Sequence, residues 1–155
     1  MINEQLKRVG NGMKLTLEQD TLRLVQLHGE QAYPNEGAGF LLGRFQDGIA
    51  LVDTILPLTN SREAEAQRNR YLLTERDYLH GEQQAAERGL DVVGVFHSHP
   101  DHPAYPSEFD RAHALPNFSY LITSVHVGKA LESRSWRLRD DRSAFTEEKL
   151  ELTSV

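Results

Sequence analysis

Two histidines separated by a single residue follow an apolar run of strand length. His97 and His99 come directly after Leu90–Phe96, a nearly continuous apolar segment typical of a central, buried strand. In an extended segment, side chains two positions apart leave the same face, so both imidazoles can reach one ion. Neutral imidazole is a common zinc ligand, and a third ligand with oxygen would leave a fourth position open for water. The pattern therefore predicts a metal site here.

Asp110 is the best candidate for the third ligand, because it lies in the first turn of a short helix that Ser107 opens. The loop before this helix contains Pro100, Pro103 and Pro106. These prolines stiffen the loop and lower the entropy cost of returning Asp110 to the histidines. Two histidines, one aspartate and an open position are typical of a catalytic zinc site, whereas four protein ligands close a structural site.

Each part of this pattern also has a simpler interpretation. A lone His-x-His in a strand is often two polar side chains without a ligand. Ser107 and Asp110 form the sequence of a capping box, and the same device occurs at Thr74 and Asp77. The combination of paired histidines at a buried strand, a proline-rich loop and a Ser-x-x-Asp helix start favours the catalytic site.

The composition narrows the class of protein. The chain has 155 residues, which suits one ordinary domain, and its 17 Lys and Arg against 23 Asp and Glu give a net charge of −6. This balance argues against a dedicated nucleic-acid binder. Residues 1–14 lack the apolar stretch of a signal peptide, and no run approaches the roughly 20 apolar residues of a membrane span. Cysteine is absent, which excludes thiolate metal sites and fits a cytoplasmic protein.

Apolar runs and turn signals predict a mixture of strands and helices. Strands are expected at 14–16, 40–43, 49–56, 71–73, 90–96, 119–127, 130–138 and 143–149, and helices at 16–30, 74–89 and 107–115. Thr16 and Gln19 read as a capping box for the first helix, with Leu22, Val25, Leu24 and Leu27 on its inner side. Pro57 should end one strand, and Pro100 should stop regular pairing after the histidines.

These elements predict an α+β fold, in which a single mixed β-sheet packs with two main helices and a short helix after the metal loop. Residues 1–155 are expected to form one domain. Within it, 1–12 are expected to be a loose lead-in, 58–70 an exposed loop, and 139–155 a C-terminal edge strand or tail.

The motif residues resemble those of the JAMM (MPN+) metalloproteases. That family has His-Ser/Thr-His, seven residues, Ser-x-x-Asp, and a glutamate upstream. In this chain His97-Ser98-His99 is followed by seven residues, of which Pro100 is the first, and then by Ser107-x-x-Asp110. Glu36 is the upstream glutamate. The resemblance extends over about residues 15–138. It implies a single JAB/MPN domain with cytidine-deaminase-like layering of its sheet and helices.

The resemblance also implies a role for each motif residue. His97, His99 and Asp110 would bind one Zn²⁺ per chain. Glu36 would act as general base on the attacking water and pass the proton to the leaving amine. Ser107 would donate a hydrogen bond to the oxyanion of the tetrahedral intermediate.

The compact layout is similar to that of prokaryotic stand-alone members of the family. Those relatives imply a substrate with a ubiquitin-like or sulfur-carrier β-grasp fold, cleaved after its C-terminal Gly-Gly. Ala38 stands where several sulfur-carrier peptidases have cysteine, which weakens the specific prediction of cysteine release. A non-catalytic MPN scaffold with a vestigial metal site, or a zinc peptidase of unrelated short peptides, are the alternatives. A homodimer is left open.

Other aromatic and imidazole side chains near the motif have less defined roles. His102 and His113 either support the site or are ordinary surface residues, and the second interpretation is favoured. Trp136, Tyr105 and Tyr120 are expected to be packing residues, although Tyr105 lies between the ligands in sequence and could border the substrate groove.

Overall fold

The computed structural model describes residues 13–58 and 71–154. The strands are β1 (Lys14–Glu18), β2 (Ala38–Gln46), β3 (Ile49–Leu58), β4 (Asp91–Pro100), β5 (Ser119–His126), β6 (Lys129–Leu138) and β7 (Phe145–Thr153), and the helices are α2 (Gln19–Ala32), α4 (Glu75–Glu87) and α5 (Glu108–His113). The strand expected at 71–73 was wrong, because these residues have no regular secondary structure. The lead-in expected at 1–12, and all but the first residue of the loop expected at 58–70, lie outside the described residues.

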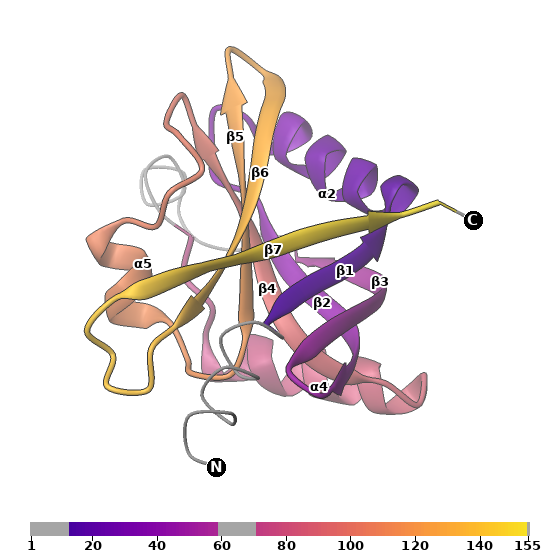
Figure 1. The fold of residues 1–155 in the computed structure, drawn as a ribbon. Helices are drawn as coiled ribbons and strands as arrows, with labels where there is room; N and C mark the ends of the chain where they lie inside the picture. The colour runs from indigo at the N-terminus through magenta and orange to yellow at the C-terminus, as the bar shows by residue number, and fades with distance from the viewer. Residues whose placement is uncertain (1–12, 59–70, 155) are drawn as a thin grey trace.

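The seven described strands form one mixed sheet in the order β1-β3-β2-β4-β5-β6-β7, which closes into a barrel (Figure 1). Antiparallel pairs join β3 to β2, β2 to β4, β5 to β6 and β6 to β7, while β4 pairs with β5 in parallel. The predicted α+β class is confirmed. The C-terminal edge strand was wrong, because β7 pairs with β6 on one side and with β1 on the other.

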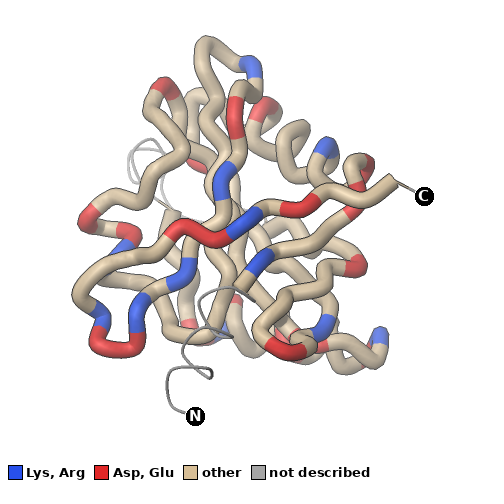
Figure 2. The backbone as a smooth tube through the Cα atoms, in the orientation of Figure 1, with Lys and Arg blue, Asp and Glu red and all other residues tan. Residues whose placement is uncertain are grey.

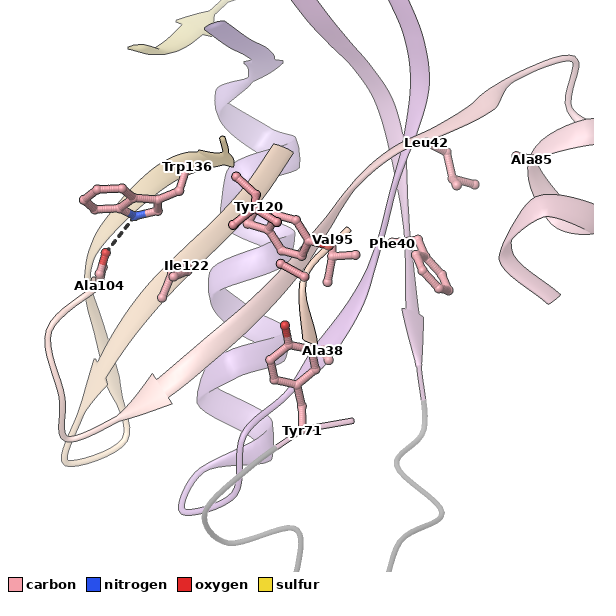
Figure 3. Close-up of a cluster of buried hydrophobic side chains, with 12 residues drawn as sticks. Ala38, Phe40, Leu42, Tyr71, Ala85, Val95, Ala104, Tyr120, Ile122 and Trp136 are labelled. Atoms are coloured by element: carbon pink, nitrogen blue, oxygen red, sulfur yellow. Dashed lines mark hydrogen bonds between the residues drawn. The ribbon is translucent and has the colours of Figure 1, made fainter. Parts of the chain in front are cut away.

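Residues that alternate along the central strands face two separate cores. On one face, α4 covers a core that includes Phe40, Val95 and Tyr120 (Figure 3). On the opposite face, α2 covers a core that includes Leu41 and Leu121. Because successive side chains of a strand point to opposite faces, each central strand contributes to both cores. The two main helices therefore lie on opposite faces of the sheet (Figure 1).

Helix α2 begins later than its sequence predicts. Thr16 lies within β1, and Glu18 is the N-cap residue without a side-chain capping bond, so the predicted Thr16/Gln19 capping box was wrong. The inner face was predicted only in part, because Leu22 and Val25 are buried whereas Leu24 is exposed.

Helix α4 begins and ends as its sequence predicts. The Thr74 hydroxyl accepts the N–H of Asp77, and the Asp77 carboxylate accepts the N–H of Thr74. Gly89 follows the helix with a φ of +68°, the left-handed conformation that glycine adopts without steric cost. Both ends of this helix are therefore encoded locally.

Of the two prolines expected to end strands, one does so and the other does not. Pro57 lies inside β3, opposite Gly39 of β2, at a point where the described pairing of β3 with β1 has already ended. A proline is tolerated there because, among the described strands, β3 is paired only with β2 at that point, and prolines occur where one side of a strand is unpaired. Pro100 is the last residue of β4, as predicted, and is opposite Val125 of β5, so regular pairing includes both histidines and ends at this proline.

Charged residues of both signs follow one another along β7 (Figure 2). Glu147 pairs with Arg134 of β6, and Glu151 pairs with Lys14 of β1. These exposed pairs link β7 to both of its neighbours. Within the described parts of the chain, none of the helices combines the length and the apolar character needed to cross a membrane.

Candidate metal centre

Strand β4 presents both histidines on the face that α4 and its core occupy. Val95 belongs to that core, and His97 and His99 follow it at alternate positions. β2 and β5 flank β4, with Ala38 opposite His97 on one side and Ser124 opposite His99 on the other. The sequence predicts the histidines directly after the strand, but the structure places them inside it. Only 1% of His97 and 6% of His99 is exposed.

Helix α5 brings Asp110 to the two histidines. The Ser107 hydroxyl accepts the N–H of Asp110 at 3.0 Å, and Asp110 Oδ2 accepts the N–H of Ser107 at 2.8 Å. This capping box fixes the carboxylate at the start of the helix, where it is buried. The two interpretations of Ser-x-x-Asp are therefore compatible, because the same carboxylate caps the helix and faces the imidazoles.

The three side chains converge on one point. The Nε2 atoms of His97 and His99 are 3.2 Å apart. Asp110 Oδ1 lies 3.3 Å from His97 Nε2, and Asp110 Oδ2 lies 3.1 Å from His99 Nε2. Zinc bonds of about 2.0–2.1 Å in tetrahedral geometry place neighbouring ligand atoms roughly 3.3 Å apart. Within the described residues, the buried His97, His99 and Asp110 are thus a group whose spacing fits a metal ion.

The two imidazoles are held in different ways. His99 Nδ1 lies 2.9 Å from the Pro103 carbonyl oxygen and donates its proton to it, which leaves the Nε2 lone pair directed at the other ligands. His97 Nδ1 has no hydrogen-bond partner among the described residues. Its ring instead stacks on Tyr71, with centroids 4.2 Å apart and planes inclined by 24°.

Electrostatics favours the metal-binding protonation state of His97 and Asp110, whereas Asp110 and Pro103 favour the protonated form of His99. Burial lowers the pKa of His97 below its usual value, although the neighbouring Asp110 opposes that shift. Burial acts in the same direction on His99, but the hydrogen bonds with Asp110 and Pro103 outweigh it and raise its pKa. Burial would raise the pKa of Asp110, but the two imidazoles and the Ser107 N–H hold it far below its usual range. Asp110 is therefore an anion at neutral pH.

Glu36 reaches the same region from the turn before β2. The Gly37 N–H donates to the Ser98 hydroxyl at 2.8 Å, and the Ser98 N–H donates to the Gly37 carbonyl at 3.0 Å, so this turn is held against β4. The Tyr71 N–H donates to Glu36 Oε2 at 2.5 Å. The Glu36 carboxylate is thereby fixed beside the two histidines.

A cavity of about 490 Å³ opens beside these groups. Its lining residues are Glu36, His99, His102, Pro103, Tyr105, Ser107, Glu108, Phe109 and Asp110. The structure therefore brings four of the five predicted site residues to one cavity wall, and the fifth, His97, contacts two of them from behind. A cavity bordered by a general-base candidate and a metal-ligand set can hold a bond to be hydrolysed.

The histidines and aromatic residues near the motif differ in whether they line the cavity. His102 lines the cavity, whereas His113 is exposed at the end of α5, where its ring lies 4.1 Å from that of Phe109. Tyr105 is half exposed and borders the cavity, with its ring 5.3 Å from Trp136. Trp136 is buried and donates its indole N–H to the Ala104 carbonyl (Figure 3), which confirms its packing role.

Tyr71 is the site residue that the sequence does not reveal. It is expected in a short strand, yet it lies between Glu36 and His97 and contacts both. Its backbone bond to Glu36 spans 35 positions of the chain, and its ring contact joins it to His97, which is also far away in the sequence. The one local signal is an aromatic residue just before a capping box, which does not indicate a function.

The chain matches the family model described as prokaryotic homologs of the JAB domain over residues 18–139. It is 29% identical over 144 residues to the CysO-cysteine peptidase of Mycobacterium tuberculosis, covering 92% of this chain and 94% of that protein. It is 28% identical over 112 residues to a probable TtuB-protein conjugate cleaving protease of Thermus thermophilus, covering 72% and 71%.

A solved structure gives the same match at the level of the fold. A solution structure of a protein from Salinibacter ruber superimposes with a TM-score of 0.71 at 44% sequence identity, covering 91% of this chain and 92% of that one.

Proposed function

We propose, because this chain belongs to the family of prokaryotic homologs of the JAB domain, that it is a zinc-dependent peptidase. Its substrate would be a ubiquitin-like or sulfur-carrier protein of the β-grasp type, cleaved at the peptide or isopeptide bond after a C-terminal Gly-Gly. Residues 1–155 would form the single catalytic domain, and its cytoplasmic location stays a prediction from composition.

The observation that carries this proposal is the convergence of three buried metal-ligating atoms on a cavity that Glu36 also lines. Hydrolysis of an amide needs an activated water, a base for its proton and a donor for the developing oxyanion. His97, His99 and Asp110 would hold the zinc, and their spacing of 3.1–3.3 Å suits its tetrahedral bonds. A site built for structure alone would have a fourth protein ligand.

Zinc, when bound, supplies Lewis acidity and lowers the pKa of a water molecule to about 7. Glu36 would take a proton from the attacking water and return it to the leaving amine. The Tyr71 N–H donates to Glu36 Oε2 and holds the carboxylate where it lines the cavity. Ser107 accepts the N–H of Asp110 and keeps its own hydroxyl proton, which it would donate to the carbonyl oxygen as that oxygen becomes negative.

The relatives support the substrate class. The names of the mycobacterial and Thermus proteins refer to a cysteine adduct of one carrier and to a protein conjugate of another. A Gly-Gly tail is narrow and extended, so it can approach a metal site along a strand. The half-exposed ring of Tyr105 at the cavity border offers an apolar surface to the chain that passes over it.

Cleavage of defined conjugates tests this function. The zinc-loaded protein would be incubated with a β-grasp carrier whose Gly-Gly terminus is extended by cysteine, and separately with the same carrier joined to a lysine side chain. Intact-mass spectrometry should reveal carrier ending in Gly-Gly, and a chelator should prevent it. Zinc-loaded protein that cleaves neither conjugate contradicts the proposal. Cleavage of unrelated short peptides alone would replace the carrier with a different substrate class.

A further inference from the structure

Tyr71 connects the two halves of the candidate centre. Its ring stacks on the His97 imidazole at 4.2 Å, and its backbone N–H donates to Glu36 at 2.5 Å. The ring is buried in the α4-side core, with 6% of the residue exposed (Figure 3). One residue therefore contacts a metal-ligand candidate through its side chain and the general-base candidate through its backbone.

The ring contact matters because the two histidines have unequal support. The Pro103 carbonyl fixes the ring plane of His99 through Nδ1. No comparable acceptor faces His97 Nδ1 in the described part of the chain, so its plane is set by packing. The Tyr71 ring stacks flat against that imidazole. A stacked ring restricts rotation of the imidazole about its Cβ–Cγ bond and so fixes the direction of Nε2. Outer contacts of this kind orient metal ligands.

The backbone contact matters because a base must be oriented as well as present. The Glu36 carboxylate lies in the turn before β2 and lines the cavity. The N–H of Tyr71 holds one of its oxygens, which reduces the number of orientations the side chain can adopt. Any shift of the Tyr71 backbone would therefore move the carboxylate and the stacked imidazole together.

We propose that Tyr71 is a positioning residue that fixes the side chains of His97 and Glu36 relative to each other. The proposal rests on the proposed function only for the identity of the metal and the base. Tyr71 does not line the cavity, so it would act through its two neighbours and not on the substrate.

Two substitutions separate the ring from its hydroxyl. Tyr71→Phe keeps the stacked ring and the N–H, and zinc affinity should stay at the parent value. Tyr71→Leu removes the stacked ring, and zinc affinity should fall by roughly 10-fold to 100-fold, as expected for an outer contact of a ligand. Affinity would be measured by competition with a chromophoric chelator. At saturating zinc, the KM of Tyr71→Leu for the conjugate should equal that of the parent protein. Equal zinc affinities in Tyr71→Leu and the parent would overturn the proposal.

A matched core variant distinguishes positioning from general stability. Phe40 lies in the same core, is fully buried, and is an aromatic side chain whose described ring contact is with Tyr78. Phe40→Leu should lower the free energy of unfolding without changing the zinc affinity of the folded protein. If Phe40→Leu weakens zinc as much as Tyr71→Leu, the effect is one of general stability and the proposal fails.

A second pair of variants tests the link to Glu36. Glu36→Ala removes the oxygen that accepts the Tyr71 N–H, whereas Glu36→Gln keeps an oxygen there; both remove the charge. Zinc should bind about threefold more weakly to Glu36→Ala than to Glu36→Gln, near the low end of coupling between contacting residues. In the Tyr71→Leu background that ratio should fall to one. An unchanged ratio overturns the link. A parent that binds no zinc refutes the proposed function instead, so the two failures are distinguishable.

Discussion

Two clusters of buried polar side chains lie on opposite parts of the barrel, and they are built in opposite ways. The metal cluster consists of His97, His99 and Asp110. The ion-pair cluster consists of Ser135 and Arg137 of β6 with Glu148 of β7. The residues of both clusters are at least nine-tenths buried, so burial of polar atoms does not by itself distinguish a functional site from a structural one.

The ion-pair cluster is complete within the chain. Arg137 Nε lies 2.6 Å from Glu148 Oε2, and the Ser135 hydroxyl donates to Glu148 Oε1 at 2.7 Å. A second nitrogen of Arg137 donates to the Gly48 carbonyl at 2.8 Å. One cation and one anion compensate each other, although Arg137 Nε and Glu148 Oε2 meet as an ion pair without hydrogen-bond geometry. The cluster therefore ties β6 to β7 and to the β2–β3 turn without any added group.

The metal cluster has lone pairs in excess. Two imidazole Nε2 atoms and a carboxylate meet within 3.3 Å, and the proton of His99 Nδ1 is already donated to Pro103. Electron-rich atoms brought this close need a cation or a shared proton between them. Convergent acceptors without a compensating cation among the described residues, and not burial, therefore distinguish the candidate metal centre from the ion-pair cluster.

The largest difference between the clusters is expected from His97→Ala. This variant removes one of three ligands, so stoichiometric zinc and all conjugate hydrolysis should be lost. Arg137→Met is the matched change in the other cluster, and it should retain zinc while lowering stability. Metal content by mass spectrometry and conjugate cleavage would be measured on both. Full zinc in His97→Ala would contradict the assignment of the metal cluster.

Glu36→Gln should separate zinc binding from catalysis. The amide keeps an oxygen for the Tyr71 N–H but cannot accept a proton from water. We expect a decrease in kcat of about 10²-fold to 10⁴-fold, the usual contribution of a general base, with zinc content unchanged. The zinc content of the same sample serves as the control. Full residual turnover would mean that another group takes the proton.

Ser107→Ala should have a smaller effect, because Ser107 both caps α5 and faces the cavity. Loss of one oxyanion donor should lower kcat by about 10²-fold. Thr74→Ala is the matched control, since Thr74 caps α4 with the same capping box away from the cavity. Each variant should lose about 1 kcal/mol of stability. If turnover is equal in both variants, or if only KM changes in Ser107→Ala, the oxyanion role is wrong.

The metal cluster could be predicted from sequence because its geometry is local. The two-residue period of β4 puts His97 and His99 on one face, and the capping box of α5 orients Asp110. Both features depend on residues a few positions apart. The central strands and α4 were predictable for the same reason, since alternation, caps and turn glycines act within one element.

The errors lie where distant segments meet. Tyr71 contacts Glu36 and His97 only because the barrel brings the three segments together. The pairing of β7 with β1 joins the two ends of the described chain, and no local sequence pattern predicts it. Leu24 fits a helical apolar pattern but faces outward, because the sheet, and not the helix, decides which face of α2 is covered.

The smallest effect on function is expected from Glu148→Gln, which should nevertheless change stability strongly. Without its anion, the buried Arg137 is an uncompensated charge, and the free energy of unfolding should fall by about 3–5 kcal/mol. The double variant Arg137→Met with Glu148→Leu removes both charges and should recover most of that loss. Urea unfolding would measure both variants, while zinc affinity and kcat of the folded protein should match the parent. A changed zinc affinity would mean that the two clusters are coupled through β6, and the comparison would no longer separate structure from function.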